Sequence, residues 1–190
     1  MKKQFLLIFL SFLFSCGGGD DSSDNYDNNI PVLNDVLTIN GTDYNLNSGN
    51  LTGYDTGDCS LTDSPINLDL DIFSSGITWN CEDEIDPSNN GEIIYFEMWT
   101  SQDQFLDSAT YQIISNGDED DCFSPGDITY ADYVVGFDGS WDSLDWMRIV
   151  EGTVNVERSG NNYNITWDVT GESGEVISGN YTGTLSYCGN

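Results

Sequence analysis

The chain has 190 residues, of which 33 are acidic and four are basic, and its formal net charge is −29. A chain this acidic repels phosphate backbones, which excludes nucleic acid as a natural partner. Because there is no histidine, and no lysine after Lys3, the sequence lacks the Ser–His–Asp, Cys–His and lysine-based nucleophile schemes and argues against an enzyme.

Residues 1–15 have the pattern of a secretory signal peptide. Two lysines precede the apolar run Phe5–Phe14, which is shorter than the roughly 20 residues needed to cross a bilayer. A leucine three residues before Cys16, and Ser15 directly before it, resemble the lipobox of bacterial lipoproteins. The resemblance implies cleavage before Cys16 and attachment of acyl chains that anchor the protein to a membrane. An ordinary signal peptide with an incidental cysteine is the alternative.

Residues 16–35 are predicted to be a flexible acidic linker, since glycine, serine and aspartate have little apolar surface to bury. A cysteine followed by Gly17–Gly19 and an aspartate cluster resembles surface-exported lipoproteins of the Bacteroidota kind. That resemblance implies an outer-membrane protein exposed at the cell surface. A spacer that only solubilises the domain is the alternative.

Residues 36–190 are predicted to form a single all-β domain. Apolar and polar residues alternate with the period of two that is typical of half-buried strands, as between Ile66 and Ile72. The pattern predicts an antiparallel β-sandwich or an up-and-down barrel-like meander of about eight to ten strands. The expected strands are 36–40, 43–46, 66–73, 76–81, 92–100, 109–115, 128–137, 147–158, 162–170 and 175–187.

Several local features refine this prediction. Both faces of Ile93–Met98 are largely apolar, which indicates a strand covered on both sides. Asn40-Gly41 and 159–161 are typical hairpin turns. Trp79, Trp99 and Trp167 are expected in the core. The meander from residue 152 to 185 resembles the C-terminal module of small β-rich lipoproteins of the same bacterial group.

Four cysteines follow Cys16: Cys59, Cys81, Cys122 and Cys188. An even number in a secreted chain predicts two disulfides, and three pairings stay open. A zinc site is disfavoured because there is no CxxC pair and no histidine. In a regular meander, the loops at 55–65, 81–91 and 116–127 and the C-terminus lie at one end, which would gather all four cysteines there.

Calcium is the one cofactor that the acidic loops suggest. Asp86 to Glu97 places oxygen ligands and a glycine at EF-hand loop positions, but an EF-hand requires flanking helices where this chain predicts strands. A Pro-Asn-Gly turn between strands is therefore the favoured interpretation, with no cofactor. The candidate calcium ligands are Asp86, Ser88, Asn90, Glu92, Asp118, Asp120 and Asp121.

The loop with Trp141, Asp142, Asp145 and Trp146 is a candidate ligand site, because aromatic rings beside carboxylates suit sugar binding. The alternative is that both rings cap the core. Asp-Ser followed by an apolar residue, at Ser108 and Ser143, resembles the O-glycosylation acceptor of Bacteroidota.

These features together predict a lipid-anchored surface protein that displays a non-catalytic binding domain for a glycan or a protein. A structural, calcium-stabilised envelope protein is the first alternative. A glycosidase that uses a carboxylate pair is the second.

Overall fold

The computed structural model describes residues 35–54, 65–81, 84–85, 90–114, 122–139 and 145–189. The chain divides into two compact units, Met1–Val32 and Leu33–Asn190, and every described residue belongs to the second. The expected signal peptide, Cys16 and nearly all of the linker lie outside the described residues. Within the described part there is no helix, so no helix there is long and apolar enough to cross a membrane.

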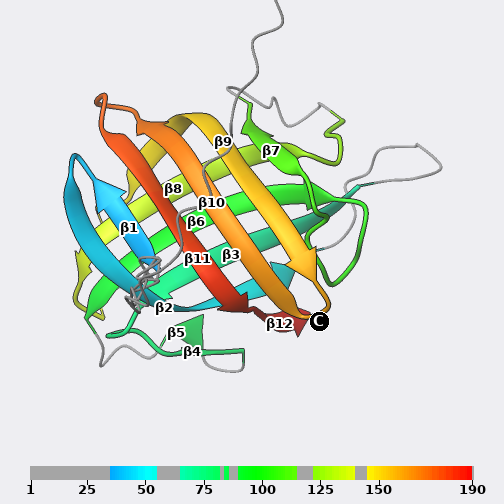
Figure 1. The fold of residues 1–190 in the computed structure, drawn as a ribbon, viewed down its shortest axis with the longest axis horizontal. Helices are drawn as coiled ribbons and strands as arrows, with labels where there is room; N and C mark the ends of the chain where they lie inside the picture. The colour runs from blue at the N-terminus through cyan, green and yellow to red at the C-terminus, as the bar shows by residue number, and fades with distance from the viewer. Residues whose placement is uncertain are drawn as a thin grey trace, which may run out of the picture. The chain divides into compact units, whose positions relative to one another are not determined.

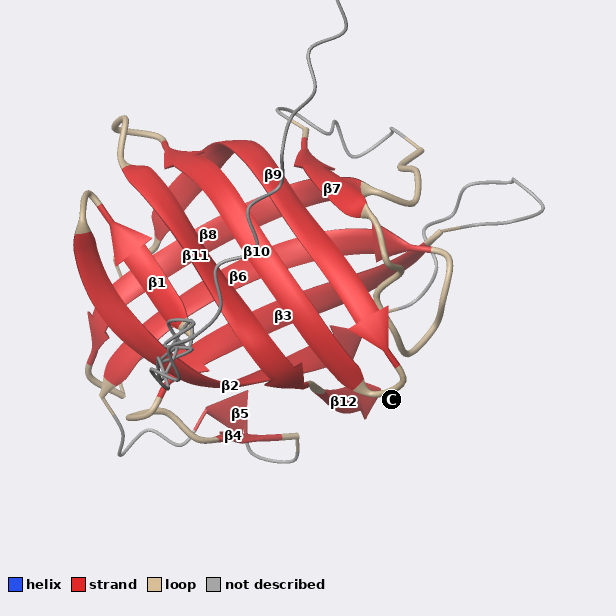
Figure 2. Ribbon diagram, in the orientation of Figure 1, coloured by secondary structure: helices blue, strands red, loops and turns tan. Residues whose placement is uncertain are grey.

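The described elements of this unit are all β-strands (Figure 2). Nine of them close into a barrel in the order β1-β11-β10-β9-β7-β8-β6-β3-β2, with β2 returning to β1 (Figure 1). The prediction of an all-β, barrel-like fold is confirmed. The strands are β1 (Val36–Ile39), β2 (Thr42–Gly53), β3 (Ile66–Ser74), β4 (Trp79–Asn80), β5 (Glu84–Ile85), β6 (Gly91–Thr100), β7 (Thr110–Ile113), β8 (Asp127–Phe137), β9 (Met147–Ser159), β10 (Asn162–Gly171), β11 (Val176–Thr184) and β12 (Ser186–Gly189).

The barrel closes where the two ends of the domain meet. β1 is short and pairs antiparallel with both β11 and the first four residues of β2. The far part of β2 lies beyond the reach of β1, and there β12 pairs with residues 50–53 in parallel orientation. β7 also pairs in parallel with β8. The barrel is therefore mainly an antiparallel meander, and its two parallel pairings are β12 with β2 and β7 with β8.

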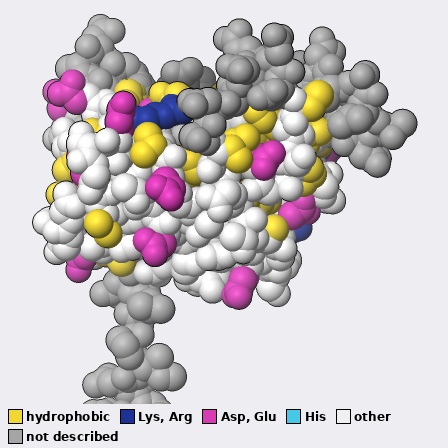
Figure 3. Space-filling model, turned by 90° about the horizontal axis from the view of Figure 1, so that it is seen from above, with side chains coloured by type: hydrophobic (Ala, Val, Ile, Leu, Met, Phe, Trp, Pro, Cys, Tyr) yellow, Lys and Arg dark blue, Asp and Glu magenta, His cyan; other side chains and the backbone are white. Residues whose placement is uncertain are grey.

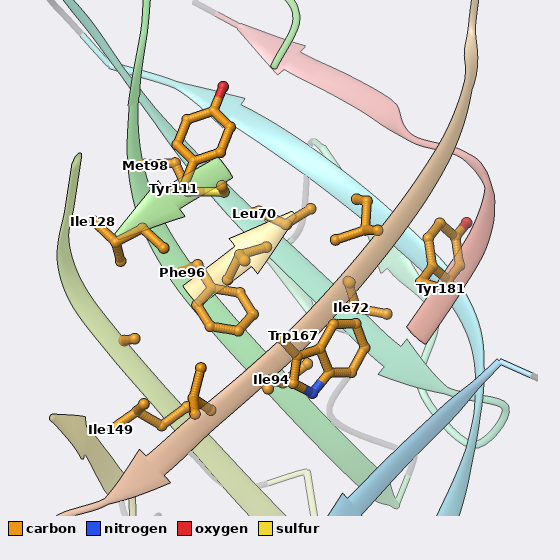
Figure 4. Close-up of a cluster of buried hydrophobic side chains, with 14 of the residues drawn as sticks. Leu70, Ile72, Ile94, Phe96, Met98, Tyr111, Ile128, Ile149, Trp167 and Tyr181 are labelled. Carbon is orange, nitrogen blue, oxygen red and sulfur yellow. The ribbon is translucent and has the colours of Figure 1, made fainter. Parts of the chain in front are cut away.

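Bulky side chains from almost every strand fill the barrel interior. Leu70, Phe96 and Trp167 are 0–3% exposed, and the Phe96 and Trp167 rings lie 6.3 Å apart (Figure 4). Along β10, residues 163, 165, 167 and 169 are buried while their even-numbered neighbours 164, 166 and 168 are exposed, as the period of two predicts. The barrel interior is therefore filled with apolar side chains, and their burial stabilises the domain.

The expected hairpin turns are present. Asn40 and Gly41 have φ values of 49° and 81° between β1 and β2, and Gly160 has a φ of 63° between β9 and β10. The two consecutive positive φ values at Asn40 and Gly41 are what a type I′ turn requires, whereas a type II′ turn requires one positive φ, at a glycine such as Gly160. Sequence and backbone geometry therefore agree at both corners.

One expected strand is wrong, and it changes the layout of the loops. Residues 76–81 do not enter the barrel, because β3 pairs directly with β6. The segment supplies only β4, which forms a two-stranded ribbon with β5 outside the barrel (Figure 1). The chain after Ser74 therefore starts at the end of the barrel opposite to the connection that follows β2. The segment then returns along the outside of the barrel, so that Cys81 lies near Gly53 and is bonded to Cys188 at the end where β2 stops. These two cysteines therefore meet at one end, as predicted, although the chain after Ser74 leaves the barrel at the other end.

Truncation of a central core residue should reveal how tightly the interior is packed. We expect Phe96→Ala to lower the free energy of unfolding by about 3–5 kcal/mol, because it leaves a cavity among rigid neighbours. Urea unfolding followed by tryptophan fluorescence measures it. Val176→Ala, at a side chain that is 62% exposed, is the control and should change stability by less than about 0.5 kcal/mol. A loss below about 1 kcal/mol in Phe96→Ala would contradict a filled interior.

Candidate functional site

Polar side chains form two rows across the outer face of neighbouring strands. The strand register places each member beside the next, so the rows run perpendicular to the strands. The first row is Asn50, Asp71, Tyr95, Asp132 and Arg148. The second row is Thr52, Asp69, Glu97 and Tyr130. Polar residues on the outside of a barrel normally face water, yet Asn50, Asp69 and Asp132 are 1%, 9% and 3% exposed.

A second apolar cluster adjoins these rows on the outer face. Its members are Phe73, Ile77, Ile93, Val134 and Phe137, with Trp79 packed against them. The Trp79 ring stacks on Phe73 with ring centroids 5.7 Å apart and an interplanar angle of 13°. The segment after β3 therefore folds back over the outside of the barrel, because its apolar side chains cover outward-facing apolar positions of β3, β6 and β8.

A disulfide holds this segment against the end of the domain. Cys81 is bonded to Cys188 on β12, across a sequence separation of 107 residues. The indole Nε1 of Trp79 lies 3.3 Å from the Cys188 sulfur and donates a hydrogen bond to it. The cross-link and the ring contact hold Trp79 and Cys81 beside the polar rows, where these residues form a wall.

Between this wall and β8 the outer face holds a pocket of about 530 Å³, within the usual range for ligand sites. Five aromatic side chains line it: Tyr54, Trp79, Tyr95, Tyr130 and Trp146. Three carboxylates line it as well: Asp69, Asp71 and Asp132. A second hollow of about 370 Å³ shares Tyr54, Asp69 and Tyr95 with the first, and a third of about 220 Å³ shares Trp79. The three hollows follow one another across the outer face.

Burial controls the charge of the two carboxyl groups on β3. Desolvation raises the pKa of Asp69 to about 7, and the nearby Glu97 carboxylate adds to this rise while hydrogen bonds from Tyr95 and Tyr54 oppose it. Desolvation also raises the pKa of Asp71 to about 8, with a further rise from the Asp69 charge and an opposing hydrogen bond from Asn50. Each group is therefore poised between its neutral and ionised forms near neutral pH.

Asp132 has a different environment from the β3 pair. Its burial raises its pKa, but the Tyr130 hydroxyl and the Arg148 guanidinium both act in the opposite direction. An Arg148 nitrogen lies 3.8 Å from Asp132 Oδ1, and the guanidinium stacks 3.4 Å above the centre of the Tyr130 ring. This arginine is thus held by a carboxylate and an aromatic face, at the β8 side of the pocket.

Some polar atoms of the site have no hydrogen-bond partner among the described residues. They include Oδ1 of Asp69 and Oδ1 of Asn50. Leaving a buried acceptor unpaired costs about 1–3 kcal/mol, and such atoms in native proteins usually bind water or a ligand. Asp69 lines two of these hollows, so its carboxyl group carries a buried acceptor without a partner at the boundary of space that a ligand can occupy.

The predicted aromatic loop is only partly described. Trp146 is 37% exposed and lies in the lining of the main pocket, whereas Asp145 is exposed and does not line it. Trp141, Asp142 and Ser143 lie outside the described residues. The pocket therefore brings Trp146 together with carboxylates from β3 and β8, rather than with Asp145.

Of the expected core tryptophans, Trp167 alone lies in the barrel interior. Trp99 is 6% exposed but faces outward, where it donates a hydrogen bond to Thr129 Oγ1 at 2.9 Å and packs on Phe123. Trp79 also lies outside. The expected burial of Trp99 is therefore confirmed, although segments outside the barrel cover it, whereas Trp79 is only half-buried and is not a core residue.

Only some of the candidate calcium ligands lie in the part of the chain that the structure describes. Asp86, Ser88, Asp118, Asp120 and Asp121 lie outside the described residues. Asn90 is exposed, and the Glu92 amide donates to Ser74 Oγ. Residues 91–100 form a strand, so the helix that would follow an EF-hand loop is not formed, and Glu97 accepts a hydrogen bond from Asn67 at 2.7 Å. Among the described side chains, no group of three or more Asp, Glu or Cys is placed to hold a metal ion.

Two further expectations concern covalent chemistry. Cys122 is disulfide-bonded, in addition to the Cys81–Cys188 pair, while Cys59 lies outside the described residues. Ser108 is exposed, and its hydroxyl accepts a hydrogen bond from the Arg158 amide at 2.9 Å. O-glycosylation of Ser108 stays a prediction.

The carboxylates at the centre of the pocket were not predicted as site residues. Asp69 and Asp71 alternate with core residues, and the alternation alone predicts that they face solvent. The sequence feature that could have predicted their burial lies on the neighbouring strand β6, where Ile93–Met98 is apolar on both faces. A covered outer face on β6 implies cover over its neighbour β3 as well, and so implies buried acids.

Comparisons of the chain with protein-family models, with curated proteins and with solved structures found no match. On the face shown in Figure 3, acidic side chains are scattered among uncharged ones and basic side chains cover little of the surface.

Removing the cross-link should destabilise the domain. We expect Cys81→Ser with Cys188→Ser to lower the free energy of unfolding by about 2–4 kcal/mol, because the unfolded chain regains freedom over a long loop. It should also change the fluorescence of Trp79, which contacts the sulfur. Ser186→Ala, on the same strand β12, is the control. Unchanged stability of the double variant in urea would contradict a bracing role for the disulfide.

The buried acids should reverse the usual dependence of stability on pH. An unfolded aspartate ionises near pH 4, whereas Asp69 and Asp71 do so near 7 and 8 in the folded protein. The folded state therefore binds more protons in this window, and we expect stability to fall as pH rises from about 4 to about 8. Urea unfolding at several pH values measures the slope.

A matched pair of variants separates this effect from general charge repulsion. Asp69→Asn with Asp71→Asn should flatten the slope, whereas Glu151→Gln with Asp168→Asn removes two exposed acids and should retain it. Equal slopes in the two double variants would show that the buried carboxyl groups are not responsible.

Proposed function

We propose that this protein is a lipid-anchored cell-envelope protein whose β-domain binds a glycan, without catalysis, in the pocket on the outer face of β3, β6 and β8. The observation that carries the proposal is a pocket lined by five aromatic side chains and three carboxylates, one of which has a buried oxygen with no partner among the described residues.

The chemistry of a sugar matches this lining. A pyranose ring has an apolar face of C–H groups, which packs on aromatic rings, and a rim of hydroxyls, which donate to carboxylates. Trp146 is partly exposed and Trp79 is half-buried, so both rings present surface to a ligand. Asp69 and Asp71 lie between them in the lining and supply the acceptors.

The arrangement of the hollows favours an oligosaccharide over a single sugar. The main pocket adjoins a second hollow through Asp69 and Tyr95, and a third through Trp79. Each shared side chain stands at the junction between two hollows. A chain of sugars that crosses these junctions would meet an aromatic ring at each one.

The cellular location in this proposal rests on the sequence. The resemblance of the segment before Cys16 to a lipobox supports lipid attachment, and the acidic residues after it support export to the surface of an outer membrane. A surface lipoprotein meets glycans of the cell's own envelope and of its surroundings, which is consistent with a glycan ligand.

A carboxylate-pair glycosidase is the second candidate, because a buried carboxyl group with a raised pKa is the usual general acid of such enzymes. The geometry favours it less. Asp69, Asp71 and Asp132 all rise from one sheet surface, whereas glycosidases place their two carboxyl groups on either side of the scissile bond. We expect no hydrolysis of glycans that bind, and release of reducing sugar would reverse this ranking.

Binding to a glycan array, followed by calorimetric titration of the best ligand, tests the proposal. We expect Trp146→Ala to weaken binding about tenfold, since loss of one stacked ring costs about 1 kcal/mol or more. Phe105→Ala is the control, because Phe105 lies under Arg158 away from the pocket lining. The proposal fails if no glycan binds, or if the two variants weaken binding equally.

A further inference from the structure

The positive charges of the chain do not reach the carboxyl groups on β3. After Lys3 the sequence contains two basic residues, Arg148 and Arg158. Arg148 pairs with Asp132 and stacks on Tyr130, and Arg158 lies 3.8 Å above the centre of the Phe105 ring. Neither arginine therefore offers its charge to Asp69, which is buried, or to Asp71, which is partly buried.

Asp69 and Asp71 are well placed to hold one small cation together. They are two residues apart on one strand, so they share a face with Cα atoms roughly 7 Å apart. Asp69 Oδ1 is buried and has no partner among the described residues. Asp71 accepts one long hydrogen bond, 3.4 Å, from Asn50, whose own Oδ1 is also unpartnered. Tyr95 and Tyr54 donate to the Asp69 carboxyl group, yet its Oδ1 and the Oδ1 of Asn50 lack a donor among the described residues.

A ligand that fits this site brings donors and a positive charge. A sugar hydroxyl both donates and accepts, and it does not compensate the negative charge that appears when either carboxyl group ionises. An ammonium group donates three hydrogen bonds, accepts none, and neutralises a carboxylate. The aromatic rings of Trp79 and Tyr95, which share the lining, add favourable contacts for a cation.

We propose that the pocket is specific for an amino sugar with a free, protonated amino group, and that this group lies between the carboxylates of Asp69 and Asp71. The inference deepens the glycan-binding function proposed above and rests on it. Among the described side chains no set of three metal-binding residues is available, which favours an organic cation over a metal ion at this point.

The environment of the pair predicts a second signature, release of protons on binding. Without ligand both carboxyl groups are largely protonated at about pH 5.5, because their pKa values are about 7 and 8. An ammonium group stabilises the ionised form, so its binding displaces protons to the buffer. The titratable groups that face the pair are Tyr54, Tyr95 and Glu97. Tyr130 and Asp132 line the same pocket, and Arg148 is paired with Asp132.

The test uses matched sugars that differ in charge. Oligomers of glucosamine and galactosamine, and their N-acetylated counterparts, are titrated calorimetrically into the purified protein at about pH 5.5, where the amino groups of these sugars are largely protonated. Salt at about 0.15 M screens attraction to the distant acidic surface. We expect at least one free amine to bind about tenfold or more tightly than its acetylated form. Titrations in two buffers of different protonation enthalpy should show proton release for the amine alone.

Two double variants test whether Asp69 and Asp71 cause the preference for the amine. Asp69→Asn with Asp71→Asn should abolish the preference for the amine, whereas Glu151→Gln with Asp168→Asn, an equal loss of charge outside the pocket, should preserve it. A preference that persists in the first variant overturns the inference, as does calcium that competes with the amine at micromolar concentration.

The two proposals fail separately. Equal binding of acetylated and free sugars, both weakened by Trp146→Ala, would overturn the amino-sugar inference and leave the glycan-binding function in place. Absence of binding to these sugars and to every glycan on the array would overturn both.

Discussion

The alternation of side chains along each strand imposes the constraint on which this structure depends. One face of every barrel strand points inward, and the interior is filled by residues such as Phe96 and Trp167. A ligand site must therefore be built on the outer wall, where a single sheet surface offers no enclosure. The chain solves this with a second, smaller apolar cluster outside β3, β6 and β8, over which the segment with Ile77 and Trp79 folds. Packing outside the barrel is what converts a flat surface into a pocket.

The same cover creates the unusual electrostatics of the site. Asp69 and Asp71 would be ordinary surface carboxylates if the outer face were open. Burial makes their ionised forms costly, and the arginine nearest to the pocket is already bound to Asp132. The two acids lower the stability of the folded protein, since replacing them with apolar residues is expected to be neutral or stabilising. A site that reduces stability in this way is more readily explained by binding than by architecture.

Much of the fold was predictable from the sequence, and the site was not. The alternation in Ile66–Ile72 and Tyr163–Val169 identifies strands and their inner faces, and Asn40-Gly41 identifies a turn. The same alternation misled at Ile77 and Trp79, which lie on a segment outside the barrel. Periodicity tells which residues share a face, but not what covers that face. Depth of burial at Asp69, and its approach to Trp146 and Cys188 in one lining, depend on contacts between segments far apart in sequence.

The short strand β1 has a consequence for the order in which the protein acquires its structure. It is the piece that joins β2 to β11, so the hydrogen-bonded ring stays open until residues near 180 are available. Contacts between such distant segments form slowly, because the loop between them must first be closed. Until then, β1 and the far end of β2 have unpaired edges, which wait for β11 and β12. Exposed edges of this kind favour association with other chains, so under the export proposed above we expect folding to depend on rapid completion of the chain's passage or on a chaperone that shields these edges.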